Sequence, residues 1–164
     1  MEKHEALERL LKAYSGYYNI NRETPMKPFA AEASFEKHDE QYFLMKSAKL
    51  SEADSREYLF FALEEVLTCD RLLELDRLAW EECLRRTVPE ENHKNTDAAL
   101  LILADRVEEE ALPLIRRMRH YKSYRFGLRG FSSYRLLVCE TTTEKMTTNR
   151  TADAHLRAFR NVLL

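Results

Sequence analysis

The spacing of apolar residues divides the amino-terminal part of the chain into one helix and two strands. Apolar positions recur at helical spacing over about residues 2–20, which predicts an amphipathic helix. After two prolines, apolar and polar residues alternate over 29–36 as in a half-buried strand. The polar cluster 37–40 then predicts a hairpin turn, and residues 42–49 predict a second strand.

The middle of the chain contains a predicted strand, 57–63, in which residues 58–63 are apolar at odd and even positions alike. A strand of this kind lies inside a sheet with both faces covered. Thr68 is typical of a helix N-cap, and the broad apolar stripe that follows predicts a helix over about 69–86. Polar residues 88–96 predict a loop, and the apolar run 98–104 has the length of a strand.

The carboxy-terminal third shows helical spacing again over 107–118. Because Pro113 falls inside that range, the helix is either kinked or begins near this proline. Alternation over 124–128 and over 134–138, with a glycine between them, predicts a hairpin of two strands. A polar stretch follows, and Thr151 is a suitable cap for a last amphipathic helix.

The predicted order of elements is α-βββ-α-β-α-ββ-α. We find no internal repeat and no linker biased enough to divide the chain, and 164 residues suffice for one buried core. The sequence therefore predicts a single α+β domain over residues 1–164, with a mostly antiparallel sheet of about six strands flanked by helices.

Composition limits the compartment and the class of the protein. Hydrophobic residues make up 45% and charged residues 33%, which is enough apolar material for a folded domain. The three cysteines, Cys69, Cys83 and Cys139, have no C-x-x-C spacing, so no disulfide framework or zinc knuckle is indicated. The start of the chain lacks the apolar run of a signal peptide, and no stretch could span a bilayer. We expect a cytoplasmic protein with no membrane contact.

Charge is strongly segregated along the chain. Residues 1–110 hold 25 acids and 15 Lys or Arg, a net of -10, whereas residues 111–164 hold 3 acids and 11 bases, a net of +8. No acid occurs between Ala111 and Cys139. Such asymmetry indicates an anionic partner, or a fold or homo-oligomer that places the two halves against each other.

The candidate site is the basic segment 116–135, in which arginines are interleaved with aromatic residues, a combination that grips phosphate and stacks on bases. Three interpretations stay open: a surface for an anionic ligand or nucleic acid, an interface with another subunit, or arginines that are exposed or paired with acids of residues 1–110. On the predicted hairpin three of these arginines, 125, 129 and 135, share one face. The candidate anion-binding residues are Arg116, Arg117, Arg119, Lys122, Arg125, Arg129 and Arg135.

The leading hypothesis is a non-catalytic binding or scaffold module, and the alternative is an enzyme. The first six predicted elements resemble, in order alone, the core of metal-dependent, restriction-endonuclease-like nucleases. That chemistry needs an acid-x-Lys motif on the third strand, and no lysine here has an acid two positions before it. Two positions after Glu57, where the motif needs lysine, the chain has leucine, so a nuclease on this core would be degenerate in its catalytic motif. No metal-ligand spacing and no glycine-rich phosphate loop occurs, so no cofactor is expected.

Three stretches carry a resemblance to a known group of sequences. They are FEKHDEQY continuing to Lys49, YKSYRFGL continuing to Tyr134 and Arg135, and TNRT at 148–151. Together they are similar to an uncharacterised family of small bacterial proteins to which no activity is assigned. The resemblance implies a bacterial cytoplasmic origin and no particular chemistry.

Overall fold

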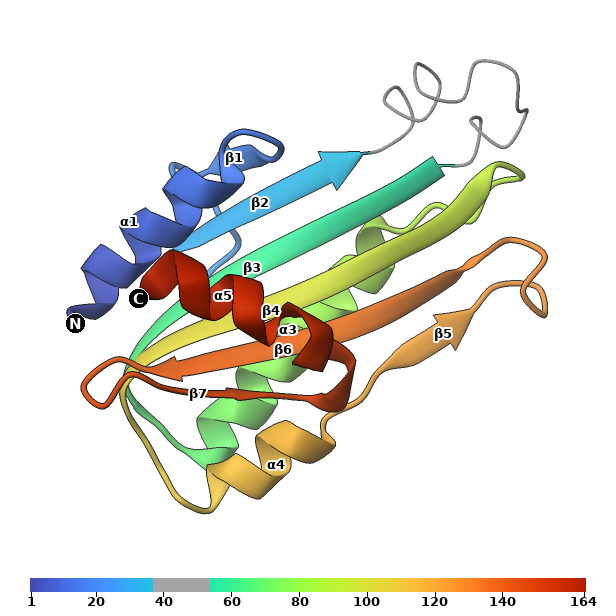
Figure 1. The fold of residues 1–164 in the computed structure, drawn as a ribbon. Helices are drawn as coiled ribbons and strands as arrows, with labels where there is room; N and C mark the ends of the chain where they lie inside the picture. The colour runs from blue at the N-terminus through green and yellow to red at the C-terminus, as the bar shows by residue number, and fades with distance from the viewer. Residues whose placement is uncertain (37–53) are drawn as a thin grey trace.

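A computed structural model describes residues 1–36 and 54–164, and in these residues one mixed sheet lies between two layers of helices (Figure 1). The predicted turn 37–40 and strand 42–49 lie outside the described residues. The helices are α1 (Lys3–Tyr14), α3 (Cys69–Arg86), α4 (Ala111–Arg117), the 3-10 helix η2 (Arg150–His155) and α5 (Leu156–Leu163). The strands are β1 (Asn19–Asn21), β2 (Ala31–Glu36), β3 (Asp54–Leu67), β4 (His93–Val107), β5 (Tyr121–Ser123), β6 (Phe131–Glu140) and β7 (Lys145–Thr148).

The strands form one sheet in the order β1-β2-β3-β4-β6-β5, with β7 also paired to β6. Four pairings are antiparallel, but the two parallel ones, β3 with β4 and β4 with β6, join the three longest strands. Each parallel connection crosses over through a helix, and crossovers of one hand place α3 and α4 on the same face. The predicted α+β fold with flanking helices is confirmed, and its sheet has seven strands where about six were expected.

Each face of the sheet has its own hydrophobic core, since side chains alternate between the faces along a strand. On the face under α3 and α4, Phe60, Leu100 and Leu136 are buried. On the other face, Phe61 and Leu101 pack under α1 and α5. The central strands are therefore apolar at both parities because helices cover both sides, as the stretch 57–63 predicted.

Several helix boundaries follow from local chemistry. The predicted helix 69–86 is confirmed as α3, where the Thr68 hydroxyl accepts a hydrogen bond from the Arg71 amide at 3.0 Å. α4 begins at Ala111, so Pro113 lies in its first turn, where no intrahelical amide bond is needed. Of the two alternatives, the helix that begins near Pro113 is thus confirmed. α1 is shorter than predicted and ends at Tyr14.

The predicted strand 124–128 is wrong. β5 covers Tyr121–Ser123 only, and the residues that follow form the turn to β6. Arg125 and Phe126 have φ of 49° and 56°, which a strand excludes. The alternating residues therefore mark a turn in which Phe126 and Leu128 are exposed, while the Tyr124 hydroxyl lies 2.9 Å from that of Ser132. The expectation that the three hairpin arginines share one strand face is also wrong.

Candidate functional site

The seven predicted basic residues fall in three places. Arg116, Arg117 and Arg119 lie at the end of α4, and Lys122, Arg125 and Arg129 lie in β5 and the turn after it. Arg135 lies on β6 and faces α1 and α5. Six of the seven thus follow one another along the α4–β5 edge of the molecule (Figure 1).

The arginines at the end of α4, together with Arg119 after it, line a hollow of about 320 Å³ with Arg150 and Thr151 from the start of η2. Arg116 is fixed in it, because its guanidinium pairs with Asp153 at 2.7 Å and donates to the Thr148 carbonyl at 2.7 Å. A hydrogen bond from Arg116 and a second from Thr148 hold the pKa of Asp153 below its usual value of 3.8. Sequence reasoning missed Arg150, since only the fold brings it beside α4.

The ion pairs discriminate between the interpretations of the basic segment. Arg135 pairs with Glu57, and this is the one predicted residue seen to pair with an acid of residues 1–110 in the described part of the chain. Arg116 pairs with a nearby acid of its own half. The other five predicted basic residues form no ion pair with any described residue. These are Arg117, Arg119, Lys122, Arg125 and Arg129. We call these five residues the basic edge.

The turn between β5 and β6 is held rigidly at its base. Tyr124 donates its amide to the Gly130 carbonyl at 2.9 Å and accepts from the Arg129 amide at 3.0 Å. The buried His93, at the start of β4, donates Nδ1–H to the Arg129 carbonyl at 2.5 Å, and its Nε2 lies 2.8 Å from the Thr96 hydroxyl. The arginines of the turn therefore project from a fixed frame.

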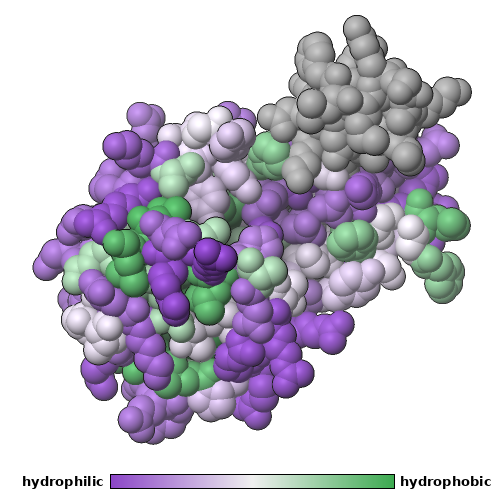
Figure 2. Space-filling view, viewed as in Figure 1, coloured by the Kyte–Doolittle hydropathy of each residue, from purple (hydrophilic) through white to green (hydrophobic). Residues whose placement is uncertain are grey.

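The end of the turn exposes apolar side chains among the basic ones. Phe126 is fully exposed at 104%, and Leu128 is 82% exposed. Figure 2 shows hydrophobic residues at this projecting end of the molecule. Two consecutive non-glycine residues, Arg125 and Phe126, have positive φ, a conformation that costs free energy and occurs more often at functional sites. We call residues 124–130 the hairpin tip.

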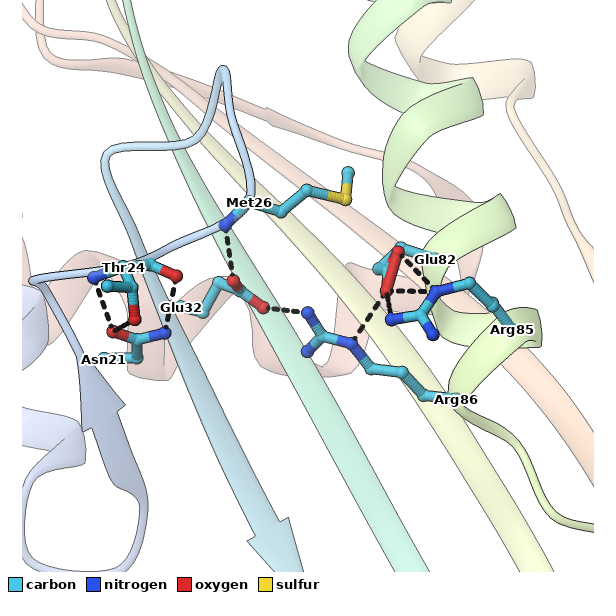
Figure 3. A network of polar contacts seen from close by, with 7 residues as sticks. All are labelled: Asn21, Thr24, Met26, Glu32, Glu82, Arg85 and Arg86. Atoms are coloured by element: carbon cyan, nitrogen blue, oxygen red, sulfur yellow. Dashed lines mark hydrogen bonds and ion pairs between the residues drawn. The ribbon is translucent and has the colours of Figure 1, made fainter.

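A second polar network joins β2, α3 and the loop before β2 (Figure 3). Arg86 pairs with the buried Glu32 at 2.7 Å and with Glu82 at 3.1 Å, and Glu32 also accepts the Met26 amide at 2.7 Å. Hydrogen bonds from Arg85 and then Arg86 lower the pKa of Glu82. All these charges are matched to one another, so the network serves to join α3 to the sheet.

Two of the three cysteines, Cys83 and Cys139, are buried. Burial raises the pKa of the Cys83 thiol to about 12 and that of Cys139 to about 11, which suits packing and not nucleophilic attack. Within residues 1–36 and 54–164, no three His, Cys, Asp or Glu side chains are grouped to hold a metal ion. None of the described helices is long and apolar enough to cross a membrane.

Comparison with known proteins places the chain in a family without giving it a function. No curated protein and no solved structure matches the sequence. The model of a family described as a domain of unknown function, DUF8052, matches residues 2–161, nearly the whole chain. The uncharacterised family expected from the three sequence stretches is thereby confirmed, and the protein belongs to the DUF8052 family.

Proposed function

We propose that this domain is a non-catalytic module that binds single-stranded nucleic acid along the basic edge and the hairpin tip. The observation that carries the proposal is the run of five cations without ion-pair partners among the described residues. Guanidinium and ammonium groups that no acid neutralises are available to phosphates, and binding then releases the counterions that surround the polyanion.

The aromatic side chains of the same edge favour a single strand over a duplex. Tyr121 is 59% exposed and stacks on Phe131 with ring centroids 5.8 Å apart, and Phe126 is fully exposed. Exposed rings beside cations stack on unpaired bases whatever their identity. The free cysteines agree with a reducing compartment, so the proposal includes a cytoplasmic location.

The geometry gives less support to the nuclease alternative. Glu57 lies on the third strand of the described sheet, where that chemistry needs a carboxylate, but its oxygens accept from Arg135 and from the Tyr18 hydroxyl. Leu59 stands at the lysine position and is buried. Cleavage of plasmid DNA by purified protein in Mg²⁺ or Mn²⁺ would favour the enzyme instead.

The direct test removes three charges of the basic edge together. We expect Lys122→Gln/Arg125→Gln/Arg129→Gln to bind fluorescent single-stranded DNA more weakly, with the slope of log affinity against log salt shallower by about 2, because each phosphate contact contributes roughly 0.7. A matched control, Lys12→Gln/Arg106→Gln/Arg160→Gln, removes three exposed cations elsewhere and should bind as the wild type does. Equal losses in both variants, or no binding by the wild type at low salt, would overturn the proposal.

The aromatic contribution is tested separately at the tip. Phe126→Ala should weaken binding of single-stranded DNA by about 5- to 150-fold, because stacking of one base on an aromatic ring is worth roughly 1–3 kcal/mol. Stability should hardly change, since the ring has no buried contact to lose. Unchanged DNA affinity, with loss of a dimer in sedimentation experiments, would assign the tip to self-association and contradict its role in stacking.

A further inference from the structure

A second hollow, remote from the basic edge, lies between α1, α5 and the sheet. Its volume of about 450 Å³ falls in the range of small-molecule sites. Tyr14, Tyr17 and Tyr18 line it from the end of α1, and Ala158 and Val162 line it from α5. Below them are apolar side chains of the core on this face, namely Leu10, Leu101, Leu137 and Phe159.

The floor of this hollow, which we call the tyrosine pocket, is built by an ion pair that crosses a strand. β4 lies between β3 and β6, and Ala99 on β4 is paired with Leu59 on one side and Arg135 on the other. Because Ala99 has a short side chain, Arg135 reaches over it to Glu57, and each of the two charged side chains is 18% exposed. A charge pair so nearly buried, with its exposed part in a hollow, is a polar group available to a ligand.

The neighbours of this pair fix the orientation of its polar atoms. The Tyr18 hydroxyl donates to Glu57 Oε2 at 3.1 Å, and Arg135 donates to His155 Nε2 at 2.8 Å. Burial and then the charge of Arg135 lower the pKa of His155, which favours a neutral imidazole. With one cation, one anion and a neutral histidine, the floor has no net charge.

The balanced charges of the floor favour a ligand without net charge. A ligand anion would be attracted by Arg135 and repelled by Glu57 at a similar distance. A ligand cation would be attracted by Glu57 and repelled by Arg135. A neutral group that both accepts from the guanidinium and donates to the carboxylate gains from both. The aromatic and aliphatic walls favour a flat body.

We propose that the tyrosine pocket binds an uncharged, planar heteroaromatic ring with a hydrogen-bond donor and an acceptor on one edge, the chemistry of a nucleobase. Its floor recognises the paired donor and acceptor, and its tyrosine and aliphatic walls hold the ring. The site is independent of the basic edge, because it needs no phosphate on the ligand.

Adenine, benzoate and benzylamine are suitable probes, because they are flat rings that are respectively neutral, anionic and cationic at neutral pH. We expect calorimetry and ligand-observed NMR to give adenine a dissociation constant below about 1 mM, with the two charged rings at least roughly tenfold weaker. Tyr14 and Tyr18 resonances should shift with adenine. The proposal would be overturned if adenine did not bind at that concentration. It would also be overturned if benzoate or benzylamine bound as tightly as adenine.

Two variants locate the binding. Ala158→Phe fills the pocket from an exposed position and should weaken adenine at least about tenfold, whereas Ala154→Phe, exposed nearby but outside the lining, should not. Glu57→Met/Arg135→Met replaces the whole pair, a change that cores often tolerate, and should also weaken adenine about tenfold. Unchanged affinity in a folded version of either pocket variant would refute the site. The Lys122→Gln/Arg125→Gln/Arg129→Gln variant should bind adenine normally even if the proposed function fails.

Discussion

Replacement of Arg86 by methionine is expected to destabilise the domain by about 3 kcal/mol, the lower end for breaking a buried ion pair, because this guanidinium is partly exposed. Among the described residues, the change leaves Glu32, whose side chain is 7% exposed, with the Met26 amide as its one remaining partner. It also removes the cation from above the Tyr58 and Phe60 rings, 5.2 and 5.4 Å away. Urea unfolding followed by circular dichroism measures the loss.

Arg85→Met is the matched control for this variant, because it removes the same kind of charge from the neighbouring position. Arg85 is 71% exposed, and its partner Glu82 keeps the ion pair with Arg86, so the loss of Arg85 should cost at most about 1 kcal/mol. Adding Glu32→Gln to Arg86→Met should recover part of the stability, since a neutral amide still accepts from the Met26 amide. An equal loss of stability in the two single variants would show that the buried pair of Arg86 with Glu32 stabilises the domain no more than the exposed Arg85 does.

The parts of the fold that could be predicted are those in which local pattern and burial agree. The 69–86 helix has a capping threonine, and the 58–63 stretch is apolar at both parities, so each pattern has one structural solution. β3 and β4 nevertheless extend well beyond the predicted runs, to Asp54–Leu67 and His93–Val107. Their ends mix polar and apolar residues without strand periodicity, and the pairing of β3 with β4 extends them as strands.

The hairpin shows why periodicity can mislead. Tyr124, Phe126 and Leu128 alternate with polar residues as a strand does, but the alternation predicts nothing about φ. Positive φ at Arg125 and Phe126 is disfavoured locally and persists because the base of the turn is fixed by His93 and by the close packing of Gly130. Tertiary contacts of this kind leave no trace in a short window of sequence.

The candidate sites differ in the same way. The charge asymmetry pointed to the basic edge, because acids are absent from a continuous segment. The charge pattern of the sequence could not reveal the tyrosine pocket. Glu57, Arg135 and His155 come from distant parts of the chain and meet only because β3, β4 and β6 lie side by side in the sheet. Arg135 was assigned to the anion-binding set by its place in the sequence, whereas the fold pairs it with an acid.

Replacement of Gly130 by alanine is expected to displace the hairpin tip and to abolish its share of nucleic-acid binding. A Cβ atom at this position would lie 2.2 Å from the Lys94 carbonyl oxygen and 2.8 Å from His93 Nδ1, and the residue has φ of +81°. The backbone conformation costs roughly 1–2 kcal/mol for a non-glycine residue and overpacking roughly 1–3 more, so a loss of about 3 kcal/mol is expected. The hydrogen bond from His93 to the Arg129 carbonyl should break first.

The contribution of close packing is isolated by Gly127→Ala in the same turn. Gly127 has φ of +88° but nothing within 4 Å of an added Cβ, so it carries the backbone cost without the clash. We expect Gly127→Ala to cost about 1–2 kcal/mol and to retain most DNA affinity, whereas Gly130→Ala unfolds at lower urea and binds as weakly as the Lys122→Gln/Arg125→Gln/Arg129→Gln variant. Chemical shifts of His93 and Tyr124 report the position of the turn. Unchanged chemical shifts and unchanged DNA affinity in Gly130→Ala would contradict the claim that a rigidly held tip presents Arg125, Phe126 and Arg129 to the nucleic acid.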